Sequence, residues 1–192
     1  MKPSRLGLLG GSFNPIHHGH LIVAERAVEQ LRLDRILFIP TAVSPLKNAS
    51  DLAPAADRMA MARLALKGHP LFEASDAEVK RGGVSYSFDT VERLKTTSEV
   101  FLVIGDDAVS DLPKWYRIHD LAARVTFAVA GRPGNYPPPP PGPWKLRRLR
   151  VPLIEISGTE IRDRVRRGLS IRYLLPEAVE RYIRSHGLYR TP

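Results

Sequence analysis

The chain has 192 residues, 43% of them hydrophobic and 26% charged, which is the size and composition of one ordinary globular domain. It contains no cysteine and no apolar run near the roughly 18 residues of a membrane helix, which excludes disulfide, thiolate-metal and cysteine-nucleophile chemistry and predicts a cytoplasmic protein without membrane contacts. The net charge is +9, and residues 141–192 hold 12 Lys and Arg against 5 Asp and Glu, which favours an anionic partner unless these charges only solvate a helix face.

Short apolar runs alternate with helix-like segments along the chain. Buried strands are predicted at 6–9, 35–40, 99–104, 125–130 and 151–155, with a weaker candidate at 71–74. Apolar residues at helical spacing predict helices at 20–32, 57–67 and 87–95. This alternation predicts an α/β fold with a mostly parallel sheet and helices on both of its faces.

The C-terminal third begins with a segment of low complexity. Residues 136–143 include five consecutive prolines, which exclude a helix or a central strand, so we expect an exposed polyproline-like loop that serves as a stiff connector or as a docking site. Further on, Ser157 and Glu160 have the spacing of a capping box and predict a helix over 157–167. A last helix is predicted over 176–187, between a proline and a glycine.

The densest chemical signal is Gly-Gly-Ser-Phe-Asn-Pro-Ile-His-His-Gly-His at 10–20, between the first strand and the first helix. Glycines let backbone N–H groups approach a phosphate, and a helix N-terminus adds positive potential. His17 and His20 are placed to donate hydrogen bonds to one phosphate as charge develops on it. A metal site built with His18 as well is an alternative, but no carboxylate lies within the loop to complete its ligands.

A second signal lies at 157–162. Its simplest explanation is helix capping by Ser157. The alternative is that Ser157, Thr159 and the free backbone N–H groups bind another phosphate, with Arg162 one turn further along. An arginine near a helix N-terminus gains nothing from the helix dipole, so we expect Arg162 to face an anion.

Together the two segments resemble the nucleotidyltransferase superfamily marked by His-x-Gly-His and Ile-Ser-Ser/Thr-x-x-Ile-Arg, and within it the chain resembles the bacterial nicotinate-nucleotide adenylyltransferases. The resemblance spans nearly the whole chain in order, with the proline-rich loop as the main exception. The further matching stretches are Ser85-Tyr86-Ser87 with Asp89-Thr90, Gly105-Asp106-Asp107 with Trp115-Tyr116, Gly131-Arg132-Pro133-Gly134, and Leu174-Leu175-Pro176 to Gly187-Leu188-Tyr189.

This resemblance implies a single nucleotidyltransferase domain over 1–192, with a Rossmann-like, doubly wound core over 1–155 and a small C-terminal helical part over 156–192. It implies adenylyl transfer from ATP, with Mg²⁺, to nicotinate mononucleotide. The products are deamido-NAD (nicotinate adenine dinucleotide) and pyrophosphate, and the reaction is a step of NAD biosynthesis. No nucleic-acid partner and no metal held by the protein itself are expected.

The resemblance also assigns roles to residues of this chain. His17, His20 and Arg162 would act on the reacting phosphates. Trp115 would stack on the pyridine ring, beside a nicotinate carboxylate near Tyr86 and Ser87. The remaining expected contacts are Gly11, Ser12, Phe13, Gly105, Asp107, Ser157 and Thr159 for ATP, and Lys47 for the phosphate of the mononucleotide.

The chain departs from the family pattern at four positions. Asn14 replaces the usual Asp, Gly158 the second Ser, Ser87 the usual Thr, and Leu46 the His of Pro-His-Lys. Two alternatives stay open: an adenylyltransferase for nicotinamide mononucleotide or pantetheine phosphate, and a basic nucleic-acid-binding module. The Ser-Tyr-Ser and Trp-Tyr stretches argue against pantetheine phosphate, and few aromatic residues stand among the C-terminal arginines to stack on bases.

Overall fold

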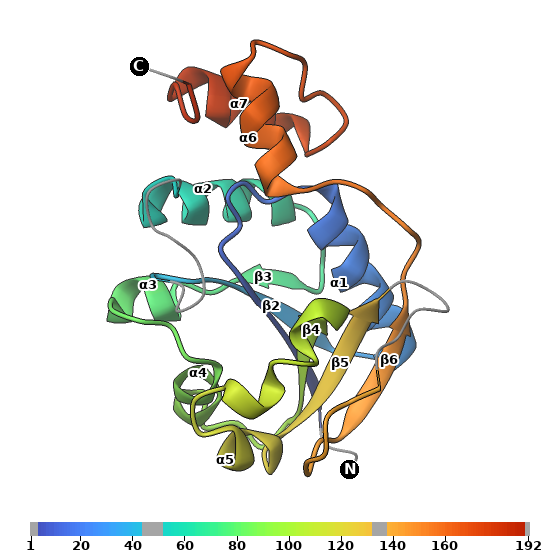
Figure 1. The fold of residues 1–192 in the computed structure, drawn as a ribbon. Helices are drawn as coiled ribbons and strands as arrows, with labels where there is room; N and C mark the ends of the chain where they lie inside the picture. The colour runs from blue at the N-terminus through green and yellow to red at the C-terminus, as the bar shows by residue number, and fades with distance from the viewer. Residues whose placement is uncertain (1–3, 44–51, 132–137, 191–192) are drawn as a thin grey trace.

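The computed structural model describes residues 4–43, 52–131 and 138–190. Within them six strands form one parallel sheet in the order β3-β2-β1-β4-β5-β6 (Figure 1). The strands are β1 (Arg5–Gly11), β2 (Arg35–Pro40), β3 (Phe72–Ala74), β4 (Glu99–Gly105), β5 (Val125–Gly131) and β6 (Leu146–Arg150). The strand order reverses between β1 and β4, and open α/β sheets bind ligands at the carboxyl end of such a switch point.

Helices cover both faces of the sheet, as the alternating pattern predicts. The helices are α1 (His18–Leu31), α2 (Ala55–Leu66), α3 (Ala77–Arg81), α4 (Ser87–Arg93), α5 (Ile118–Ala122), α6 (Gly158–Arg166) and α7 (Glu177–Ser185), with short 3-10 helices η2 (Asp106–Ala108) and η3 (Leu112–Lys114). Along β4, Phe101 and Val103 pack in the hydrophobic cluster that contains α1, whereas Leu102 and Ile104 pack in the cluster that contains α4 and α5. The predicted doubly wound, Rossmann-like architecture is confirmed.

Helices α6 and α7 lie beyond the carboxyl ends of the strands, with α7 beside α2 (Figure 1). Ile161 of α6 and Val179 of α7 are fully buried and belong to the same hydrophobic cluster as Phe38 of the sheet. The hydroxyl of Tyr182 on α7 donates to Oδ1 of Asp57 on α2 at 2.8 Å. This packing brings the second sequence signal over the edge of the sheet where the first one lies.

The predicted strand at 151–155 is wrong, because the last strand is β6 at Leu146–Arg150 and the following residues have no regular structure. β6 is an edge strand in which Leu149 alone is buried, while its arginines are exposed. Charged side chains commonly protect an edge strand, and here they conceal its apolar pattern. The five-residue helices α3 and α5 were also not predicted, whereas the weaker candidate at 71–74 is confirmed as β3.

The proline-rich loop is an exposed, irregular connector over 138–143, whereas 136 and 137 lie outside the described residues. The indole N–H of Trp144 donates to the carbonyl oxygen of Pro140 at 2.7 Å and closes the end of this connector. No helix in the described parts of the chain is long and apolar enough to cross a membrane.

Candidate functional site

The loop after β1 turns over the end of the sheet into α1. Phe13 is buried at a φ of 44°, in the left-handed region, and its ring lies edge-on to the ring of His20, with centroids 5.0 Å apart. A Cβ added at Gly19 would lie 3.0 Å from two atoms of the His17 ring. The glycine of the His-x-Gly-His pattern therefore lets the His17 imidazole lie against the first turn of α1.

The two predicted histidines lie together, with ring centroids 3.8 Å apart. The backbone N–H of His17 donates to Nδ1 of His20 at 3.3 Å, so a neutral His20 ring carries its hydrogen on Nε2. Burial, and to a lesser degree the nearby His18, lowers the pKa of His17 to about 4. Burial thus favours a neutral His17 ring, and this ring lies beside that of His20.

The metal alternative for this loop has no support in the structure. Within the described residues no three His, Cys, Asp or Glu side chains are gathered where they could hold an ion. The Nδ1 atom of His17 is buried and has no hydrogen-bond partner among these residues. A buried nitrogen without a partner is more typical of an atom that bonds a ligand than of one whose hydrogen bonding is completed within the fold.

The second predicted segment meets the first at the N-terminus of α6. The Glu160 N–H donates to Oγ of Ser157 at 3.1 Å, which confirms the predicted helix cap. The Arg162 guanidinium donates to the main-chain oxygen of Asn14 at 2.9 Å and to Oγ1 of Thr159 at 3.4 Å. The first contact joins residues 148 positions apart, so the fold holds the two predicted phosphate-binding segments against each other.

A buried arginine that sequence reasoning missed lies beneath this meeting point. Arg58 of α2 is 1% exposed and donates hydrogen bonds to three main-chain oxygens, those of Ser12 (2.7 Å), Ala53 (2.9 Å) and Ala42 (3.3 Å). Burial lowers the pKa of its guanidinium from the ordinary value. The only sequence signal was a cation on the apolar side of a predicted helix, and that pattern does not distinguish a buried arginine from a surface one.

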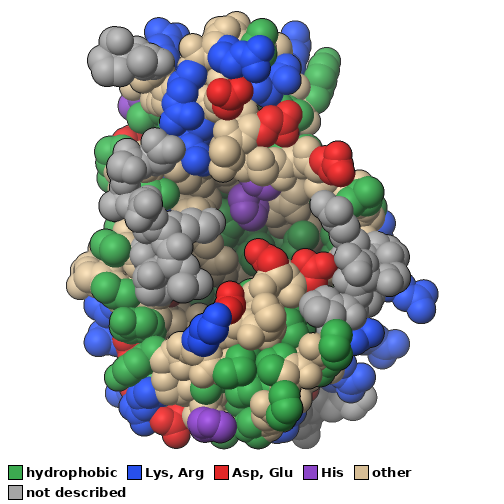
Figure 2. All heavy atoms as spheres, in the orientation of Figure 1, with side chains coloured by type: hydrophobic (Ala, Val, Ile, Leu, Met, Phe, Trp, Pro, Cys, Tyr) green, Lys and Arg blue, Asp and Glu red, His purple; other side chains and the backbone are tan. Residues whose placement is uncertain are grey.

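A pocket of about 400 Å³ opens at the carboxyl ends of β1 and β4. The residues that line it are Gly10, Gly11, Ser12, Thr41, Glu78, Ser85, Tyr86, Ser87, Leu102, Val103, Ile104, Asp111, Lys114, Trp115 and Tyr116. It thus gathers five predicted contacts from three separate stretches of sequence: Gly11, Ser12, Tyr86, Ser87 and Trp115. On the same face, Figure 2 shows a hollow with histidine side chains at its upper edge and Lys and Arg side chains over α6 and α7.

Aromatic rings form one wall of this pocket. The rings of Tyr86 and Tyr116 lie 4.6 Å apart, and the indole of Trp115 meets the ring of Phe127 edge-on at 6.4 Å. Trp115 is only partly buried, so one part of the indole packs in the core and another borders the pocket. This arrangement provides a flat apolar surface for a ring-shaped ligand.

Three buried polar atoms on the pocket wall have no hydrogen-bond partner among the described residues. They are Oγ1 of Thr41, Oε2 of Glu78 and Nε1 of Trp115. A buried polar group without a partner costs roughly 1–3 kcal/mol, so three of them in one pocket indicate a ligand that supplies the missing bonds. Thr41 was not predicted because nothing in the sequence distinguishes it from any residue that follows a strand. Glu78 was not predicted because it lies on the short helix α3, which the hydrophobic pattern did not reveal.

The remaining predicted residues lie elsewhere. Gly105 ends β4 and Asp107 is exposed on η2, both at the sheet edge but outside the lining of the pocket. Phe13 is buried beneath the loop, where it supports the fold of that loop. Lys47 lies outside the described residues, as does Leu46.

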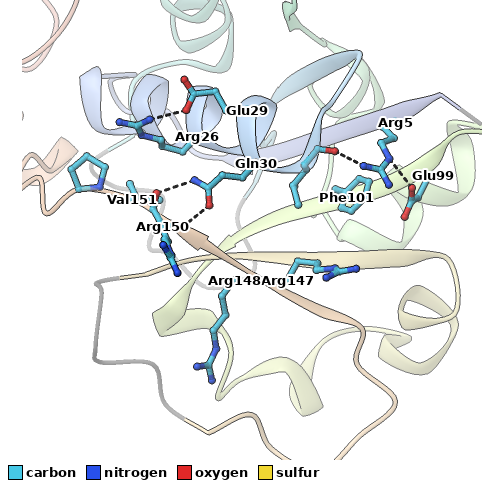
Figure 3. A pocket seen from close by; sticks show the side chains of 12 residues that line it. Arg5, Arg26, Glu29, Gln30, Glu99, Phe101, Arg147, Arg148, Arg150 and Val151 are labelled. Carbon is cyan, nitrogen blue, oxygen red and sulfur yellow. Dashed lines mark hydrogen bonds and ion pairs between the residues drawn. The ribbon is translucent and has the colours of Figure 1, made fainter.

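A larger cavity, of about 900 Å³, lies between α1 and β6 and contains none of the predicted residues (Figure 3). Its walls carry five arginines and two glutamates: Arg5, Arg26, Arg147, Arg148, Arg150, Glu29 and Glu99. Arg5 pairs with Glu99 at 3.1 Å and Arg26 with Glu29 at 2.7 Å, while the Gln30 amide bonds both main-chain groups of Arg150. Its charge is thus partly neutralised by its own residues.

Comparisons with known proteins identify the family of this chain. Residues 8–164 match the model of the cytidylyltransferase-like family. A probable nicotinate-nucleotide adenylyltransferase of Thermomicrobium roseum is 42% identical over 98% of this chain and 92% of its own length, and one of Salinibacter ruber is 42% identical over 96% and 97%.

The fold also matches solved structures. The nicotinic acid mononucleotide adenylyltransferase of Plasmodium falciparum, solved in complex with NaAD, superposes with a TM-score of 0.76 over 97% of both chains, at 18% identity. That likeness concerns the fold, whereas the sequence relatives are close enough to place the family. The chain belongs to the cytidylyltransferase-like family and, within it, to the nicotinate-nucleotide adenylyltransferases.

Proposed function

We propose that the protein transfers the adenylyl group of ATP to nicotinate mononucleotide, giving nicotinate adenine dinucleotide and pyrophosphate. A phosphate oxygen of the mononucleotide forms a bond to the α-phosphorus of ATP, and the bond from that phosphorus to the bridging oxygen of the β-phosphate breaks. The observation that carries the proposal is the contact of Arg162 with the Asn14 main chain. That contact sets a cation against the loop that leads to the histidine pair, and the same loop contributes Gly11 and Ser12 to the lining of the pocket with the aromatic wall.

The chemistry needs no general base, because the attacking phosphate is already ionised. Catalysis then consists of orienting the two phosphates and neutralising the charge that builds up on the leaving pyrophosphate. In this proposal Nε2–H of His20 donates to the reacting phosphate, and His17 donates or accepts as a neutral ring. Arg162, Ser157 and Thr159 bind the triphosphate at the N-terminus of α6.

The pyridine ring of the mononucleotide is proposed to occupy the aromatic pocket. A pyridinium cation is attracted to the face of an indole, which Trp115 supplies. Tyr86 and Ser87 lie at the start of α4, where they and nearby backbone N–H groups can bind the nicotinate carboxylate. Gly105 and Asp107, on the adjoining edge, are proposed for the nucleotides and Lys47 for the substrate phosphate.

Mg²⁺ is proposed to enter as part of the ATP substrate. Magnesium keeps several of its waters and binds substrate phosphates with few protein ligands. The residues of this chain would then bind the phosphates that carry the ion.

The proposal is tested by pyrophosphate release from Mg-ATP with three acceptors in parallel: nicotinate mononucleotide, nicotinamide mononucleotide and phosphopantetheine. We expect the highest kcat/KM with nicotinate mononucleotide. A preference for phosphopantetheine, or no turnover with either pyridine mononucleotide, would overturn the proposal. A preference for the amide would keep the reaction class and reassign the substrate. Salt-dependent binding to generic duplex DNA, without turnover, would support the basic-module alternative.

A further inference from the structure

The segment after α7 lies against the loop that follows β1. The Tyr189 hydroxyl donates to Oδ1 of Asn14 at 2.8 Å, and the Ala53 N–H donates to the same oxygen at 3.0 Å. Asn14 is 5% exposed, so both bonds lie in a dry environment. One amide oxygen therefore joins three stretches of chain: the first loop, the segment just before α2 and the segment after α7.

The main chain of Asn14 also fixes the position of α6. Its carbonyl oxygen accepts from the Arg162 guanidinium at 2.9 Å. A Cβ added at Gly158 would lie 2.8 Å from the same oxygen, so the helix and the loop are as close as a residue without a side chain allows. Any shift of Asn14 would therefore move the N-terminus of α6 and the Arg162 guanidinium relative to the histidines.

The third partner, Tyr189, is placed to remain a donor. Burial raises the pKa of its hydroxyl above the ordinary value, with the nearby Arg162 and Arg58 acting in the opposite direction. The phenol thus keeps its proton at physiological pH. In the hydrogen bonds from Tyr189 and Ala53, the acceptor is the amide oxygen of Asn14. A carboxylate also provides such an acceptor, whereas a hydrocarbon side chain does not.

We propose that Asn14 and Tyr189 are positioning residues that hold α6 against the first loop, so that Arg162 and the histidine pair can bind one phosphate chain at the same time. Neither side chain contacts the phosphates in this role. The inference rests on the proposed function for the identity of that phosphate chain, which is ATP. It also gives a reason for Gly158 at the helix start, where the family pattern has Ser.

Three substitutions separate positioning from ordinary stability. Tyr189→Phe removes the hydroxyl and keeps the ring, Asn14→Leu removes the acceptor at similar volume, and Asn14→Asp keeps the acceptor. The matched control is Tyr182→Phe, because that hydroxyl also anchors the C-terminal helices, through Asp57 of α2 at 2.8 Å, but does not reach the first loop. The measurements are the thermal shift induced by ATP, steady-state kinetics for both substrates, and hydrogen exchange of the backbone amides at 157–162.

We expect Tyr189→Phe and Asn14→Leu to lower kcat/KM for ATP about tenfold, reduce the ATP-induced thermal shift and speed exchange at 157–162. The KM for the mononucleotide should stay within about twofold. Asn14→Asp should retain ATP parameters within about threefold of wild type. Tyr182→Phe should leave them unchanged, although it loses a hydrogen bond of the same kind.

Equal effects of Tyr189→Phe and Tyr182→Phe on ATP and on exchange would overturn the inference and leave the C-terminal segment a purely structural attachment. If Asn14→Leu does not fold, this comparison of the two tyrosines still decides. Absence of turnover in the wild-type protein would instead overturn the proposed function. The exchange measurement needs no substrate, so it tests the positioning role in either case.

Discussion

The pocket at the carboxyl ends of β1 and β4 differs from the larger cavity between α1 and β6 in the hydrogen bonding and ion pairing of its polar groups. This larger cavity is an arginine-lined groove (Figure 3). The groove is larger and carries more charge, but Arg5 and Arg26 are paired with glutamates and the Gln30 amide bonds the last residue of the edge strand. The pocket is smaller, and the Thr41 and Glu78 atoms on its wall have no hydrogen-bond partner among the described residues. Buried polar atoms without partners therefore favour the pocket over the groove as the proposed ligand site, although the groove has more volume and more charge.

The largest effect is expected at the histidine pair, which follows the loop that lines part of the pocket. His20→Ala removes a donor aimed at developing charge, so kcat should fall by on the order of 10²–10³ with little change in either KM. His18→Ala, at the first residue of α1, is the control and should retain activity within about threefold. A folded His20→Ala variant with most of its kcat would remove His20 from the mechanism.

The next effect is expected at Arg162. Loss of a charged hydrogen bond, worth roughly 1.5–3 kcal/mol, should lower kcat/KM for ATP at least tenfold in Arg162→Gln. The bond to the Asn14 main chain adds a structural cost, so the free energy of unfolding should fall by about 1 kcal/mol. The control is Arg167→Gln, at the residue that follows α6, whose ion-pair partner Asp163 is exposed. Normal turnover with reduced stability would show Arg162 to be only a structural residue.

Trp115→Ala tests the aromatic wall. Stacking on one ring is worth roughly 1–3 kcal/mol, so the KM for the mononucleotide should rise at least fivefold, while the KM for ATP changes little. Trp144 is the matched control: it is partly buried like Trp115, lies outside the pocket, and its N–H already bonds Pro140. Equal damage to both substrates, together with a lower melting temperature, would instead indicate a core residue.

A pH titration distinguishes the two regions further. His17 is buried and titratable, whereas the arginines of the groove keep their charge. With a pKa of about 4 in the folded protein and about 6.5 unfolded, the unfolded state binds more protons between these values. The free energy of unfolding should therefore fall as the pH drops from 6.5 toward 4, by at most about 1.4 kcal/mol per pH unit from this residue. Urea titrations of His17→Gln should show a shallower fall, and identical slopes would contradict the assignment.

The smallest effect is expected in the groove. Arg147 and Arg150 are exposed on the edge strand, so replacing both by Gln should change turnover less than about twofold and stability by less than about 0.5 kcal/mol. A loss as large as that of Arg162→Gln would show that the groove takes part in the function, as the pocket is proposed to do.

Much of the fold was readable from local pattern. Apolar runs at strand length, helical spacing and a capping residue before α6 depend on neighbours in sequence, so the strands β1, β2, β4 and β5 and the helices α1, α2, α4, α6 and α7 were predicted within a few residues. The glycine and histidine spacing of the first loop and the Ser157–Arg162 segment likewise identified two chemical segments and the family they resemble. β6 was misplaced because an exposed edge strand does not need an apolar pattern.

Only the tertiary structure decided how these segments combine. The bonds from Arg162 and Tyr189 to Asn14 span 148 and 175 positions, and no periodicity along the chain encodes such distances. The burial of Arg58 and Glu78 and the resulting pocket are likewise consequences of packing, since a charged residue in a sequence is usually exposed. Sequence thus determined which groups could bind phosphate. The packing of α6 and α7 on the sheet edge determined that they face one site, because hydrogen bonding and burial depend on proximity in space and not in sequence.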